Sequence, residues 1–440
     1  MGRRRVGRWP LVLPAAAEGV ATAVALGYGP LYMRQALGEP RLAVTTLMLA
    51  LSALTWFVAA AVWGRLGDRV SRPLALVGGT LLVCGVVQAA LAVVGGSAAF
   101  IAVVVVCSYL LAAIAPLSVS WLTLADPEHP AEESAGFYRM RSVGWTIGSI
   151  GTSLLVNLLD LSGITAAFLI SSGVSVAVAL AVLTAARGLE APRREAVLDT
   201  ANPAPANPPR GSATAPAVSA NAPIGPFGAP EMSANPSGQG RRVAIWRFHA
   251  VGTLVAVVLL TTTGNEAFFA VVGPYLTEYL SGPPEYVGIS IGVASFLGIV
   301  IMGPLGRVAD RWGAERVLVA GCLIYAAMYA LIAAWRDPLA TVVLFGSPVF
   351  PFMSLGATGT LSRRTPAARR SEAVGVYEGT AALAAAIGSL LGGVVADAAG
   401  LGWVPVMAWM LAMGGLLVAW GRLRPGSAPA RGDRSGAPIH

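Results

Sequence analysis

Apolar residues occur along this chain in blocks of about 20, and short polar or glycine-rich segments separate most of the blocks. A helix needs about 20 apolar residues to cross the roughly 30 Å of hydrocarbon in a bilayer. The pattern therefore predicts an all-α membrane protein with twelve transmembrane helices, near residues 10–33, 41–63, 73–94, 98–122, 138–159, 163–186, 248–276, 284–306, 315–335, 338–361, 373–396 and 401–421.

The region between the sixth and seventh blocks has a different composition. Ten of the 30 prolines fall between Pro192 and Pro236, among Ala, Asn, Ser and Gly. Such a segment buries too little apolar area to offset its ordering entropy, so we expect residues 188–243 to form a disordered linker. The linker would separate an N-terminal six-helix bundle (1–187) from a C-terminal one (244–422), with a polar tail at 423–440.

Charge is sparse and unevenly placed. Only 12% of the residues are charged, about half the share in soluble proteins. All 30 basic residues are Arg, and most of them lie on the face shared by both termini and the linker; Arg34, Arg41 and Arg336 lie on the other. This bias predicts a multi-pass protein of the cell inner membrane with both termini in the cytoplasm, in contact with lipid rather than nucleic acid.

The two halves of the chain repeat each other. Gly64 to Arg72, after the second block, is matched by Gly306 to Arg316 after the eighth. Gly29-Pro30 in the first block matches Gly273-Pro274 in the seventh, and Gly136 and Tyr138 match Gly375 and Tyr377. Duplicated six-helix halves are typical of secondary transporters.

The repeated segment resembles a signature of the major facilitator superfamily, a Gly-x-Leu-Ala/Gly-Asp-Arg-x-Gly-Arg-Lys/Arg loop after the second helix. The first copy departs from it at Ser71 and Pro73. The resemblance implies two pseudo-symmetric six-helix bundles around a central substrate site. It also implies that the motif charges latch the bundles together on the cytoplasmic side; the alternative is that they anchor the loop to anionic headgroups. The gating candidates in the two copies are Gly64, Asp68, Arg69, Arg72, Asp310 and Arg311.

Two acidic residues lie within apolar blocks. A charge at the centre of a membrane helix costs about 3 kcal/mol or more, so such residues usually serve a function. Glu18 lies in the first helix, and Glu266, preceded by Asn265, lies in the seventh. In the fold that the resemblance implies, both helices line the central cavity. We expect these acids to couple transport to protons or to contact substrate; the alternative is a neutral Glu bonded to a neighbouring group.

Other polar residues are weaker candidates. Arg139 and Arg141 open the fifth helix, and Glu378 holds the related place on the eleventh. They either anchor the helices at the interface or form a gate between the halves. Four further polar residues lie within predicted helices and either contact the substrate or serve helix packing. They are Tyr28, Gln88, Tyr109 and Asn157.

Small residues mark two related helices. The fifth helix carries Gly144, Gly148 and Gly151, and the eleventh carries Gly388, Gly392 and Gly393. This spacing predicts close helix packing.

The sequence contains no Walker loop, no clustered metal ligands and no catalytic constellation. We therefore expect a monomeric transporter without a cofactor, not an enzyme. The predicted function is efflux of a small amphiphilic molecule or drug by proton antiport, because few charges face the cavity. The alternatives are proton-coupled uptake or sugar efflux by the same fold, or a membrane sensor that does not transport.

Overall fold

The computed structural model describes residues 9–70, 72–125, 130–188, 249–364 and 370–422. The predicted linker and tail fall almost entirely outside these residues, so their predicted disorder is not tested. We refer to residues 9–188 as the first half and to residues 249–422 as the second half.

Within these ranges, twelve helical spans have the length and apolar character to cross a membrane. The first half contains α1 (Trp9–Thr22), α2 (Tyr28–Gln35), α3 (Leu42–Arg69), α4 (Pro73–Ala89), α5 (Ser97–Leu111), α6 (Ile114–Ala125), α7 (Pro130–Leu159) and α8 (Ser162–Gly188). The second half contains α10 (His249–Pro274), α11 (Glu285–Trp312), α12 (Ala314–Ala334), α13 (Pro338–Phe345), α14 (Phe350–Arg364), α15 (Arg370–Ala399) and α16 (Val404–Arg422). Three of the spans consist of two consecutive helices each, α1–α2, α5–α6 and α13–α14. The predicted helix count and fold class are confirmed.

Three spans are interrupted in ways that the hydrophobic pattern did not predict. A π-helical turn (Ala23–Gly27) joins α1 to α2, and the spans formed by α5–α6 and α13–α14 are each broken near their middle. The π turn precedes Pro30, whose ring would clash with the carbonyl of Leu26 in a regular α-helix. Widening the helix there relieves the clash.

The prediction that the repeated motif forms a loop is wrong. Helix α3 continues through Gly64 to Arg69, and α11 continues to Trp312, so most of each motif is helical. Helix α3 ends because Pro73 begins α4 and restricts the residue before it, while Val70 is already extended. Helix α11 ends at Gly313, whose φ of 96° only glycine adopts without strain.

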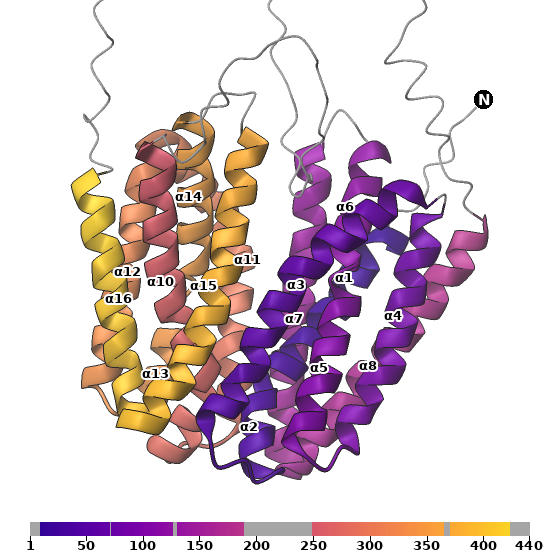
Figure 1. The fold of residues 1–440 in the computed structure, drawn as a ribbon, viewed down its shortest axis with the longest axis horizontal. Helices are drawn as coiled ribbons and strands as arrows, with labels where there is room; N and C mark the ends of the chain where they lie inside the picture. The colour runs from indigo at the N-terminus through magenta and orange to yellow at the C-terminus, as the bar shows by residue number, and fades with distance from the viewer. Residues whose placement is uncertain (1–8, 71, 126–129, 189–248, 365–369, 423–440) are drawn as a thin grey trace, which may run out of the picture.

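The two halves lie side by side and meet along two helix crossings, α3 with α15 and α7 with α11 (Figure 1). We call the end of the bundle where α1 begins and α16 ends the terminal face, and the opposite end the far face. Figure 1 shows the halves leaning together at the far face and diverging toward the terminal face.

Four of the six glycines predicted to allow close packing set the distance between helices inside each half; Gly151 meets nothing within 4 Å, and Gly393 packs against the other half. A Cβ added at Gly144 on α7 would overlap the carbonyl oxygen of Ala16 on α1. A Cβ added at Gly392 on α15 would overlap the carbonyl oxygen of Ala267 on α10. These contacts hold α1 on α7, and α10 on α15, at backbone distance, and each pair carries a candidate acid.

Two glycines on the same helix provide a test of this packing. Gly144→Ala should lower the stability of the purified protein by about 1–3 kcal/mol, because the new methyl group forces α1 and α7 apart. Gly151→Ala is the matched control, since a Cβ there meets nothing within 4 Å. Its stability should be unchanged or higher by up to about 1 kcal/mol, from helix propensity alone. Thermal unfolding in detergent measures both, and equal midpoints would contradict the packing argument.

Candidate functional site

A cavity lies between the two halves. It offers about 550 Å³ of empty space, part of which is open to solvent, and helices of both halves contribute to its walls. The lining residues are Thr22, Leu26, Leu49, Ala53, Trp56, Arg141, Trp145, Glu266, Phe269, Ala385 and Ser389. Because both halves contact its contents, a molecule bound there would respond to any movement of one half against the other.

An ion pair stands at the first-half wall of the cavity. The Arg141 Nε lies 3.0 Å from the Glu18 Oε1, and the Glu18 side chain is fully buried whereas 29% of the Arg141 side chain is exposed. The backbones of α1 and α7 touch here, since a Cβ on Gly19 would overlap the Arg141 carbonyl oxygen. Close packing by small residues thus brings a carboxylate and a guanidinium together inside the membrane.

Arg141 also contacts the aromatic wall of the cavity. Its guanidinium carbon lies 5.0 Å from the centre of the Trp56 ring on α3, which is within the range of a cation–π interaction. The fork of Arg141 is therefore held between Glu18 and Trp56, with part of it facing the cavity. Such a group can bind an anion or an acceptor oxygen without leaving its partners.

Glu266 faces the same cavity from the second half. Its Oε1 accepts a hydrogen bond of 3.2 Å from the Asn265 amide. The Oδ1 of Asn265 in turn accepts one of 2.8 Å from the Tyr329 hydroxyl. Asn265 thereby connects the cavity carboxylate to a buried tyrosine pair, Tyr325 and Tyr329, whose rings stack 6.0 Å apart.

The two acids predicted from the sequence are thus in unlike surroundings. Glu18 has the positive charge of Arg141 beside it, whereas Glu266 has the neutral amide of Asn265. A charged carboxylate in apolar surroundings requires a compensating positive charge. At Glu266 that charge would come from a proton or from a cationic group in the cavity.

The hypothesis that Arg141 and Glu378 form a gate between the halves stays a prediction. The ion pair of Arg141 is with Glu18 of its own half, and Glu378 of the second half interacts with Arg141 electrostatically over a longer range. Arg139 is exposed on the outer side of α7 and does not line the cavity. Neither arginine opens the helix, because α7 begins at Pro130.

The other polar candidates lie outside the cavity. The amide of Gln88 is buried and donates to the hydroxyl of Ser171, joining α4 to α8. Tyr109 is 38% exposed, and its carbonyl oxygen accepts a hydrogen bond from the Trp63 indole. Tyr28 and Asn157 both bond across the two halves near the far face. For Gln88 and Tyr109 the geometry favours the packing interpretation.

Among the described gating candidates of the two repeated motifs, no contact between the halves is observed. The side chains of Asp68, Arg69 and Asp310 lie outside the described residues. Arg72 and Arg311 are exposed, and Gly64 has open space where a Cβ would lie. The latch that the family resemblance implies therefore stays a prediction.

The aromatic residues of the cavity were not predicted. Trp56, Trp145 and Phe269 line it together with the charged groups. Helical spacing carried a signal for two of them, because residues three or four apart share a face. Trp145 follows Arg141 by four residues, and Phe269 follows Glu266 by three.

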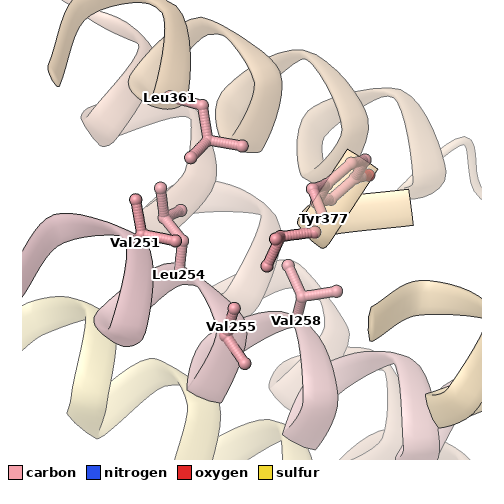
Figure 2. A pocket seen from close by; sticks show the side chains of 7 residues that line it. Val251, Leu254, Val255, Val258, Leu361 and Tyr377 are labelled. Atoms are coloured by element: carbon pink, nitrogen blue, oxygen red, sulfur yellow. The ribbon is translucent and has the colours of Figure 1, made fainter. Parts of the chain in front are cut away.

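A second, smaller hollow lies within the second half, between α10, α14 and α15 (Figure 2). It contains about 190 Å³ of empty space. Its lining is aliphatic apart from one aromatic residue, and consists of Val251, Leu254, Val255, Val258, Leu361, Val376 and Tyr377. Because it lacks charged groups and contacts one half alone, we assign the site to the cavity between the halves.

Comparison with protein-family models and curated relatives places the chain among transporters. The family model described as "MFS_1 like family" matches residues 21–405. One segment is 35% identical over 82 residues to uncharacterized MFS-type transporters of two strains of Mycobacterium tuberculosis. That match covers 17% of this chain and spans 19% of the length of those relatives.

Solved structures share the fold over nearly the whole chain. The nucleoside transporter NupG has a TM-score of 0.67 at 14% identity, with 94% of this chain and 97% of that chain covered. A bacterial homolog of the human lysosomal transporter Spinster, in an inward-facing and unoccupied conformation, has a TM-score of 0.68 at 13% identity, with 96% and 98% covered. At these identities the likeness concerns the fold alone, and it confirms the predicted architecture.

The ion pair at the cavity wall can be measured with a double-mutant cycle. Arg141→Gln should lower stability by about 3 kcal/mol, because it leaves the buried Glu18 without a partner. Adding Glu18→Gln should restore about 2 kcal/mol of that loss, as expected for two groups in direct contact. Thermal or denaturant unfolding in detergent gives the values. Arg139→Gln, on the same helix but exposed, is the control and should change little; additive effects at Glu18 and Arg141 would show that the pair does not form.

Proposed function

Because the chain belongs to the MFS_1 like family and is therefore a multi-pass membrane transporter, we propose that it exports small amphiphilic organic molecules in exchange for protons. The observation that carries the proposal is the cavity between the halves: among the residues that the structure describes, no basic group forms an ion pair with Glu266, whereas Glu18 is paired with Arg141. The chain would work by alternating access as a monomer, since one chain supplies both walls of the cavity.

The lining of the cavity supports an amphiphilic substrate. Aromatic and aliphatic side chains form most of its surface, and its polar groups are few and separate. An apolar pocket with a small number of placed polar groups favours a molecule with a large apolar body and one or two polar groups. A strongly polar molecule such as a sugar would leave most of its hydroxyls unpaired against these walls.

The position of Glu266 supports proton coupling. A single carboxylate can be neutralised either by a proton or by a substrate cation, but not by both at once. Binding of one therefore releases the other. In this scheme Glu266 exchanges a proton for the substrate, and Glu18 keeps Arg141 in place. The positive-inside rule places the arginine-rich terminal face on the cytoplasmic side of the inner membrane. Protons that enter through the protein would then drive the substrate out of the cell.

Reconstituted protein tests the coupling through Glu266. In proteoliposomes an imposed pH gradient should drive transport of the lipophilic cation tetraphenylphosphonium. Glu266→Gln should slow this driven transport by about tenfold or more, because the side chain no longer exchanges a proton. Asp160→Asn, which alters an exposed carboxylate outside the cavity, should leave it unchanged. Wild-type transport that is indifferent to the gradient would remove proton coupling.

The same vesicles distinguish the rival substrates. Counterflow with sugars or nucleosides, compared with counterflow of lipophilic cations, separates uptake or sugar efflux from export of amphiphiles. Saturable exchange of polar solutes alone would overturn the proposed substrate class while leaving the transporter assignment intact.

A deletion distinguishes a transporter from a sensor. Removal of residues 190–240 should leave the rate of transport within about twofold of wild type, because the two halves enclose the cavity without that segment. The rate in proteoliposomes and the resistance of cells to toxic amphiphiles would both report it. Loss of cellular function with normal expression and an intact transport rate would point instead to a signalling role for the segment.

A further inference from the structure

Near the far face the two halves are joined by polar contacts that the cavity does not use. The guanidinium of Arg34 at the end of α2 forms a two-bond contact with the Glu278 carboxylate of the second half, at 3.0 and 2.6 Å. Arg34 also donates to the carbonyl oxygen of Glu39, in the segment that leads into α3 (3.0 Å). One arginine thus ties the start of α3 to the other half.

The first turn of α3 receives its cap from the second half. The backbone amides of Leu42 and Ala43 donate to the two carboxylate oxygens of Asp397 on α15, at 2.8 and 2.9 Å. Within its own half the start of α3 has one such acceptor, the Glu39 carboxylate, which accepts from the Arg41 amide at 3.3 Å. Arg41 at the N-cap position makes no side-chain bond, and the first turn has no acid, so the amides of Leu42 and Ala43 rely on Asp397. Amides at a helix start need an acceptor, and the helix dipole favours a negative one.

The repeat-related crossing, α7 with α11, has the same plan. The amide of Asn157 near the end of α7 donates to the Glu285 carboxylate at the start of α11 (3.1 Å). One turn deeper, each crossing sets a glycine against a hydroxyl: Gly393 against Thr46, and Gly288 against Ser153. The backbone amide of Gly288 also donates to the Tyr28 hydroxyl at 3.0 Å. Contacts at both helix crossings, α3 with α15 and α7 with α11, therefore close the far face. Of the residues that make these contacts, Asp397 is the one that places a negative charge at the start of a helix of the other half.

We propose that Asp397 is the latch of the far face: a helix cap supplied by the opposite half, which is made when that face is closed and released when it opens. Opening separates α15 from the start of α3, so the two amides lose their acceptor in the same step that admits solvent to the cavity. Arg34 reinforces the closure through Glu278. Weakening the latch must then raise the population of the state open at the far face, whatever molecule is carried.

Cysteine accessibility measures that population directly. Ala385 lines the cavity, so Ala385→Cys reports whether a membrane-impermeant maleimide enters from the far face. The parent chain, whose three cysteines are buried, gives the background. Val93→Cys, at a position that is 82% exposed near the far face, identifies vesicles with that face outward.

Asp397→Ala should raise the labelling rate of Ala385→Cys by about fivefold, the change in an equilibrium that loss of one helix cap produces. Asp397→Asn keeps an acceptor and most of the packing, so its increase should be smaller; this variant decides the matter if the alanine variant does not fold. Arg34→Gln should act in the same direction as Asp397→Ala.

Asp337→Ala is the matched control. Asp337 also caps a helix, accepting from the Ala340 amide at 2.7 Å, but that helix, α13, belongs to its own half. Its loss should leave the labelling rate at the wild-type value. Equal rates in Asp397→Ala, Asp397→Asn and wild type, or an equal rise in Asp337→Ala, would overturn the proposal. Labelling needs no substrate, so this outcome is independent of whether the chain exports amphiphiles.

Discussion

A charge or a polar group inside hydrocarbon must find a partner within the protein, and this constraint organises the whole molecule. It makes every described membrane-spanning segment helical, because a helix satisfies its own backbone. It also explains why the acids lie between helices rather than toward lipid. Glu18 is tolerable at its depth because glycines bring α1 and α7 to backbone distance, which places Arg141 within 3.0 Å of its carboxylate. Close helix packing is therefore what positions the charged groups of the site.

The same constraint separates the two ends of the molecule. Near the far face, polar groups of one half are satisfied by the other half, as Arg34 is by Glu278. At the cavity wall the described contacts stay within each half: Arg141 pairs with Glu18, and Asn265 bonds to Glu266 and Tyr329. Contacts between halves must break when the halves move, whereas contacts within a half persist through the movement. In the proposed alternating access, the contacts at the far face would therefore change, while each half would carry its cavity wall as a unit.

The sequence was sufficient for the helix count and the two-bundle fold because the length of the hydrophobic blocks and the internal repeat each report one strong physical constraint. It selected Glu18 and Glu266 as candidates for the same reason, since a charge in an apolar block is costly; Glu266 lines the cavity, Glu18 pairs with the lining Arg141, and their roles stay predictions. It did not identify the partner of Arg141, because that pairing depends on where Gly19 meets α7. It also missed Asp397, because its partners are backbone amides of a distant helix. The only trace of that contact in the sequence is that Arg41, at the N-cap position of α3, cannot cap the helix with its own side chain. The loop prediction for Gly64 failed because the motif suits a helix as well as a turn.

Helix α3 joins these observations. Its start is capped by α15, its middle supplies Trp56 to the cavity, and its last turns carry the first copy of the repeated motif. An unbroken helix transmits a displacement at one end to the other, because its backbone bonds resist bending. Release of the cap at the far face would therefore shift Trp56, and with it the cation–π contact of Arg141, in the same movement. Opening of the far face and rearrangement of the cavity wall are then one event, as alternating access requires.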